Sequence, residues 1–163
     1  STMFLKIDLG FTMIKTGNIF CLFSGMLLGG VYGGLAAGIG SMLYDFTDPR
    51  FAAMAYTTLI NFFAMGCVCG VVSHLRGKRG ADFKQNILGA VLGSVTYVFL
   101  YLLKNVLTLT LGSGEPLMTA LVTMLPKLGI SAINAVTAVI FSVLLAKPLM
   151  RALEKNGFLE KLQ

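Results

Sequence analysis

Residues 17–44 read GNIFCLFSGMLLGGVYGGLAAGIGSMLY, a stretch that contains no charged side chain. As a single helix this stretch would be about 42 Å long, whereas the hydrocarbon core of a bilayer is about 30 Å thick. It is therefore too long for one upright membrane span and short for two. The glycine pairs at 29–30 and 33–34 interrupt it near the middle, which favours a tight turn there. We predict two short helices, at about residues 18–30 and 32–46.

The composition of the whole chain also indicates a membrane protein. Of its 163 residues 56% are apolar and only 12% are charged, whereas soluble domains carry about 25% charged residues. A soluble fold of this size could not hide so much apolar surface. A soluble enzyme, a disordered chain and a nucleic-acid-binding domain are therefore excluded, and the bilayer is the solvent that suits the chain.

Apolar stretches further along the chain predict the other spans. Phe51–Leu75 and Ile87–Leu111 are each long enough to cross the bilayer as a helix. Pro126 suits the first turn of a helix, so 117–125 is interpreted as a short re-entrant or interfacial helix and 127–146 as the last span. The predicted fold is an all-α integral membrane helical bundle with five visible spans.

The chain is expected to form a single transmembrane domain with a segment on either side of the bundle at 18–146. Residues 1–7 are interpreted as the end of a first helix, and the stretch to residue 17 as an outer loop. Residues 147–163 are charged and amphipathic, which is typical of a tail outside the membrane.

Basic residues predict the orientation of this bundle. Four of them lie in the loop 76–84 and four in the tail, and cytoplasmic segments of membrane proteins carry such an excess. If residues 17–44 were a single span, Lys6 and Lys15 would also be cytoplasmic. The charge rule thus slightly favours that alternative, whereas length and the paired glycines favour two helices.

Lys104 is the clearest candidate for a functional residue inside the membrane. A charge in the bilayer costs about 3 kcal/mol, so its presence needs a reason. Tyr97, Tyr101 and Lys104 are spaced so that they share one helix face, and Asn105 lies beside them. Lys104 could contact a ligand, extend to the outer headgroups, or pair with Asp45.

Other polar residues are expected at a similar depth in the bundle, where they would form a polar cup open to the outside. The asparagines could instead make hydrogen bonds between helices, and the tyrosines could be ordinary interface aromatics. The predicted substrate-binding residues are Lys104, Asn105, Tyr101, Tyr97, Asn61, Tyr56, Asn134, Lys127, Ser131, Asp45 and Asn18.

The sequence lacks several nucleotide-binding and catalytic motifs. There is no phosphate-binding G-x-x-x-x-G-K-[ST] motif, so the chain cannot itself power transport with ATP. His74 is the only histidine, and no G-x-S-x-G motif is present, which disfavours an integral enzyme. No cofactor is expected. The cysteines at 21, 67 and 69 lie in apolar runs and are interpreted as small packing residues.

The glycine-rich stretch resembles a known family. GNIF at 17–20, followed by FSGMLLGGVYGGLAAGIGS at 23–41, is similar to the second and third helices of the substrate-binding S components of energy-coupling-factor (ECF) vitamin transporters. These helices often end in an aspartate, as here at Asp45. Leu125-Pro126 followed by Asn134 also looks like the start of the last helix in that family.

This resemblance implies a six-helix bundle, of which the first helix is largely missing here, in the cell membrane of a bacterium. A vitamin-like solute would be captured with high affinity near the outer face, under the outer loops. The bundle would then topple and release the solute, driven by a transmembrane coupling subunit and ATPase subunits. Family members often carry lysines in the fourth and last helices, where Asn61 and Ser131 stand here.

Two matters stay open at this stage. Tyrosine, asparagine and lysine suit a small hydroxylated heterocycle, and a pyridoxine-like or pyrimidine-like ligand is our expectation. The alternative function is a membrane scaffold of similar helical architecture that transports nothing. A scaffold would not need an enclosed polar cup that contains Lys104.

Overall fold

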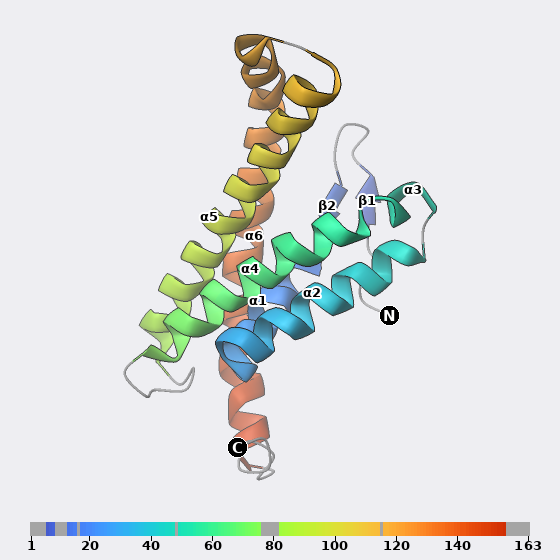
Figure 1. The fold of residues 1–163 in the computed structure, drawn as a ribbon. Helices are drawn as coiled ribbons and strands as arrows, with labels where there is room; N and C mark the ends of the chain where they lie inside the picture. Colours follow the sequence, from blue (N-terminus) through green and yellow to red (C-terminus); the bar gives the residue numbers. More distant parts are fainter. Residues whose placement is uncertain are drawn as a thin grey trace.

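The structure is a computed structural model that describes residues 6–8, 13–15, 17–47, 49–75, 82–114 and 116–155. Its architecture is a bundle of helices with one short pair of strands (Figure 1). The strands are β1 (Lys6–Asp8) and β2 (Met13–Lys15). The helices are α1 (Gly17–Leu28), α2 (Gly30–Phe46), α3 (Pro49–Ala52), α4 (Ala55–Ser73), α5 (Phe83–Leu107), the π-helical turn η3 (Thr108–Gly112) and α6 (Leu117–Lys155).

The glycine-rich stretch forms two helices, as predicted. Gly29 separates α1 from α2 and has a φ angle of 80°, a left-handed conformation that costs glycine little and other residues much. Its N–H group donates to the carbonyl of Gly25 at 3.0 Å and so completes the last turn of α1. Ser24 Oγ donates to the carbonyl of Gly33 at 3.1 Å, which ties the two antiparallel helices together beside the turn.

Glycines let α4 approach its neighbours until backbones touch. A Cβ atom on Gly25 of α1 would lie 2.6 Å from the carbonyl oxygen of Gly66 on α4. A Cβ atom on Gly93 of α5 would lie 2.7 Å from the carbonyl oxygen of Met65, which is also on α4. Small residues at helix contacts are the usual means of close packing in lipid. The bundle is therefore built around α4.

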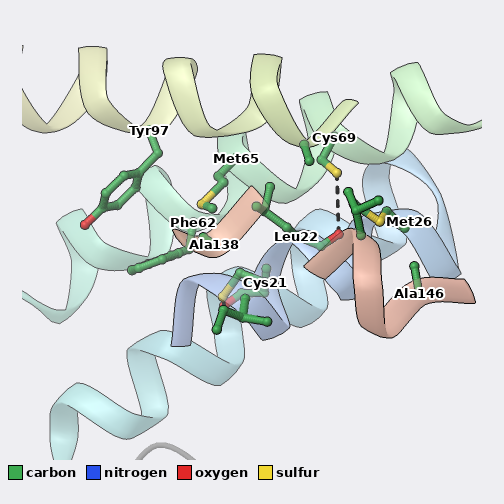
Figure 2. Packing of buried hydrophobic residues seen from close by; sticks show 13 residues of the cluster. Cys21, Leu22, Met26, Phe62, Met65, Cys69, Tyr97, Ala138 and Ala146 are labelled. Carbon is green, nitrogen blue, oxygen red and sulfur yellow. Dashed lines mark hydrogen bonds between the residues drawn. The ribbon is translucent and has the colours of Figure 1, made fainter. Parts of the chain in front are cut away.

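The buried core lies where α1, α4, α5 and α6 meet (Figure 2). Leu22, Met26 and Met65 are fully buried there. Cys69 Sγ donates a hydrogen bond to the carbonyl oxygen of Leu22 at 3.4 Å, drawn as the dashed line in Figure 2. Cys21 and Cys69 are buried free thiols, in agreement with the packing role predicted for them.

Three of the described helices are long and apolar enough to cross a membrane: Ala55–Ser73, Phe83–Gly112 and Leu117–Leu149. α2 has 17 residues and α1 has 12, so they extend for about 26 Å and 18 Å. Large apolar side chains such as Val95, Phe99 and Ile133 are mostly exposed, as lipid-facing residues are. The predicted all-α membrane bundle is confirmed.

The predicted break at Pro126 is wrong. α6 continues without interruption from Leu117 to Lys155, with Pro126 and Pro148 inside it. It therefore includes both the supposed re-entrant segment at 117–125 and the first part of the predicted tail. A proline removes one backbone hydrogen bond, and membrane helices tolerate this because neighbouring helices and local adjustments satisfy the freed carbonyl.

The helix end predicted at residues 1–7 is not seen at residues 6 and 7, the part of it that the structure describes. Residues 6–8 pair with residues 13–15 as antiparallel strands, with Ile7 opposite Ile14. Isoleucine is β-branched and favours extended backbone. Residues 1–5, the basic loop at 76–81 and the tail beyond 155 lie outside the described residues.

Candidate functional site

A groove separates α4 from α5 at one end of the bundle. The two helices pack closely near the C-terminus of α4 and diverge toward its N-terminus, as Figure 1 shows. The groove between them has a volume of about 550 Å³ and is largely open. It is lined by Thr57, Ile60, Asn61, Leu100, Leu103, Lys104, Leu107, Thr108, Leu111 and Gly112.

Lys104 lies in this groove and bridges its two walls. Its Nζ atom donates a hydrogen bond to Thr57 Oγ1 at 3.1 Å, so the ammonium group extends from α5 toward α4. Thr57 Oγ1 in turn donates to the carbonyl of Met54 at 2.7 Å. The side chain of Lys104 is half-buried. In this structure the Lys104 side chain therefore crosses to the neighbouring helix, whereas a lysine that reaches lipid headgroups extends along its own helix.

Two further polar residues line the groove beside this bridge. Asn61 is half-buried and lies one helical turn from Thr57 on the same face of α4. Thr108 is the first residue of η3, and its Oγ1 atom donates to the carbonyl of Lys104 at 2.9 Å. Thr57 was not among the predicted site residues, although its spacing of four from Asn61 was visible in the sequence.

Tyr97 and Tyr101 lie on the inner side of α5. Tyr97 is 8% exposed and belongs to the core, where its ring centre is 5.0 Å from that of Phe62 on α4 (Figure 2). Its ring also stacks on Tyr101 at 6.1 Å. Asn105 uses its amide group within its own helix, because Nδ2 donates to the carbonyl of Tyr101 at 2.7 Å.

Asn18 and Asp45 come from the paired helices α1 and α2. Asn18 is 2% exposed, and its Oδ1 atom has no hydrogen-bond partner in the described part of the chain. Asp45 is half-buried near the end of α2. It lies within electrostatic range of the Tyr97 hydroxyl. Asp45 and Tyr97 therefore lie near each other.

The remaining predicted residues lie apart from the groove. Tyr56 is 71% exposed, and its ring meets the edge of Phe46 on α2 at 6.4 Å. On α6, Lys127 is exposed, while Ser131 and Asn134 are half-buried. None of these side chains lines the groove. Of the predicted set, only Lys104 and Asn61 thus line the groove. The other predicted residues, which do not line it, are Asn18, Asp45, Tyr56, Tyr97, Tyr101, Asn105, Lys127, Ser131 and Asn134.

Metal binding finds no support within the described ranges, because no three His, Cys, Asp or Glu side chains gather there in a way that could hold an ion. The site consists of hydroxyl, amide, ammonium and aromatic groups on an apolar framework. Such groups can bind and orient a small polar molecule.

Comparison with known proteins identifies the family. The family model of the ECF-type riboflavin transporter S component matches residues 1–151. Comparisons with curated proteins and with solved structures found no match. The family match covers nearly the whole chain, including the glycine-rich helices, the groove and most of α6. The chain therefore belongs to the family of S components of ECF-type riboflavin transporters, which are the substrate-binding subunits of vitamin transporters.

Proposed function

We propose that this chain binds riboflavin with high affinity on the outer side of a bacterial cell membrane and hands it to a transporter powered by separate ATPase subunits. The observation that carries the proposal is the family match over residues 1–151. The coupling subunit and ATPases are partners implied by the family, and the chain itself contains no phosphate-binding motif.

The chemistry of the groove supports a flavin. The isoalloxazine ring of riboflavin is flat and largely apolar on its two faces, and carbonyl groups lie along one edge. Ile60, Leu100 and Leu103 offer apolar contacts to such a ring, and Lys104 and Asn61 offer N–H donors to its carbonyls. In this proposal the ligand takes over the hydrogen bond that Lys104 now makes to Thr57.

This ligand is larger than the pyridoxine-like or pyrimidine-like compound expected from residue types. Residue types in a polar site indicate hydrogen-bonding capacity and say little about the size of the ligand. The family description supports a riboflavin-type ligand instead.

Titration of the purified protein with riboflavin tests the proposal. The fluorescence anisotropy of riboflavin rises when the small molecule joins a protein in a detergent micelle, so anisotropy reports binding. We expect saturable binding, and Lys104→Ala should weaken it about 10- to 100-fold because a hydrogen bond from a charged group is lost. Lys84→Ala is the matched control, since Lys84 is exposed at the other end of α5.

Each outcome of this titration has a defined meaning. If the purified protein binds no riboflavin, the proposed function is wrong and the scaffold alternative is favoured. If riboflavin binds but Lys104→Ala has the affinity of Lys84→Ala, the groove is not where the ring is held.

A further inference from the structure

Thr57 presents a hydrogen-bond acceptor to the groove that it lines. Its Oγ1 atom donates its proton to the carbonyl of Met54 at 2.7 Å, at the start of α4. The same oxygen accepts from Lys104 Nζ at 3.1 Å. A hydroxyl group has one proton and two lone pairs, so in this arrangement Thr57 offers the groove lone pairs only. Threonine is stiff at χ1, and the bond to Met54 fixes its rotamer, so the acceptor has a defined position.

Two groups that can donate hydrogen bonds lie beside this acceptor. The ammonium group of Lys104 reaches Thr57 from α5 and can only donate. Asn61 follows Thr57 by one turn on the same face of α4, lines the groove, and carries an amide with two N–H donors. The walls of the groove therefore bring one acceptor and two donor groups together among apolar side chains.

The carbonyl edge of a flavin has the complementary pattern, because two carbonyl groups flank an imide N–H in the isoalloxazine ring. When a ring carbonyl takes over the hydrogen bond from Lys104, the Thr57 oxygen loses its donor. The imide N–H next to that carbonyl can replace the lost donor. The exchange then leaves no acceptor of the groove unpaired, which avoids the cost of desolvating a polar atom without a partner.

We propose that Thr57 is a specificity-determining residue whose hydroxyl oxygen accepts a hydrogen bond from the imide N–H of the flavin ring. The inference rests on the proposed function, since it assigns a residue to the ring edge of the ligand proposed there. Lys104 by itself discriminates little, because an ammonium group is a point charge with rotatable donors that suits any carbonyl oxygen. Thr57 adds the requirement that an N–H group stands beside that carbonyl.

Comparison of riboflavin with N3-methylriboflavin tests the inference, because the analogue carries a methyl group in place of the imide proton. Fluorescence anisotropy gives the affinity of both flavins. We expect the unmodified protein to prefer riboflavin by at least about threefold, since one neutral hydrogen bond is lost with the analogue. Thr57→Val keeps the shape of the side chain without its hydroxyl, and should reduce this preference about three- to tenfold.

Two further variants act as controls for the hydroxyl group. Thr57→Ser retains the hydroxyl and should retain the preference. Thr96→Val removes a hydroxyl from α5 that also bonds within its own helix, because Thr96 Oγ1 donates to the carbonyl of Leu92 at 2.8 Å. Thr96 does not line the groove, so this variant should keep the affinity of the unmodified protein for both flavins.

The outcomes separate this inference from the proposed function. Absence of riboflavin binding to the unmodified protein overturns both. Equal binding of the two flavins by the unmodified protein overturns the role of Thr57 alone. An unchanged preference in Thr57→Val also overturns it, even if both flavins bind more weakly, since Thr57 would then only hold Lys104 in place. Loss of the preference in Thr57→Ser overturns it as well, because the hydroxyl is still present there.

Discussion

Replacement of Gly25 by alanine should destabilise the bundle, because α1 and α4 meet there backbone to backbone. The added Cβ atom would lie 2.6 Å from the carbonyl oxygen of Gly66, about 0.8 Å less than an ordinary contact of 3.4 Å. It would also lie 3.2 Å from Cys69 Cβ and from the backbone nitrogen of Gly70. Two of these atoms belong to the backbone and the third is a Cβ atom, which is fixed to the backbone, so no side chain can rotate away and the helices must separate.

The expected magnitude is the difference between two effects. Overpacking in a close-packed core costs about 1–3 kcal/mol. Alanine is favoured over glycine in a helix by about 1 kcal/mol. The net destabilisation of Gly25→Ala is therefore up to about 2 kcal/mol, and its difference from an alanine substitution at an open helix position is about 1–3 kcal/mol. Gly40→Ala is the matched control, because Gly40 lies in α2 with no atom within 4 Å of its added Cβ, and this variant should be as stable as the parent or slightly more so.

Thermal unfolding in detergent, followed with a thiol-reactive dye, measures both variants. Cys21 and Cys69 are buried and Cys67 is half-buried, so the dye reacts as the core opens. We expect the unfolding midpoint of Gly25→Ala to fall below that of the parent and that of Gly40→Ala not to fall. Equal midpoints for the two variants would refute the backbone contact between α1 and α4.

The same assay checks two other features. Tyr97→Ala should lose about 3–5 kcal/mol of stability because it removes a buried ring packed on Phe62, whereas Tyr97→Phe should stay within about 1 kcal/mol of the parent. A similar loss in both variants would mean that the hydroxyl rather than the ring holds the core. Pro126→Ala should not destabilise the protein, since α6 is continuous there and a proline in a helix interior costs about 3 kcal/mol. A lower midpoint for Pro126→Ala would show that α6 needs the proline.

The parts of the fold that could be predicted are those that local chemistry decides. The charge-free stretch and its glycines located α1 and α2, with the turn predicted between residues 30 and 32 and found at Gly29. Glycine is the usual residue where the backbone is left-handed at the end of a helix. The break predicted at Pro126 was wrong because local chemistry does not decide the structure there. The local preference of proline for a helix start is overridden where long apolar flanks and neighbouring helices keep the backbone helical.

The candidate site was harder to predict, because helical periodicity identifies a face without identifying the helix opposite. Lys104 and its partner Thr57 are 47 residues apart, so no spacing rule links them. The predicted polar cup assumed that residues at equal depth face one another. In the structure, Asn134 and Ser131 lie on α6, outside the groove that contains Lys104. Whether any of these residues binds the ligand stays a prediction.

The glycine contacts around α4 have a mechanical consequence. Helices held apart by long side chains can slide, because rotamers rearrange one at a time. Where the carbonyl of Gly66 already touches α1, there is nothing between the two backbones that could give way. We therefore expect α1, α2 and α4 to move as one rigid body. The distances between these helices should stay constant while their tilt relative to the lipid changes.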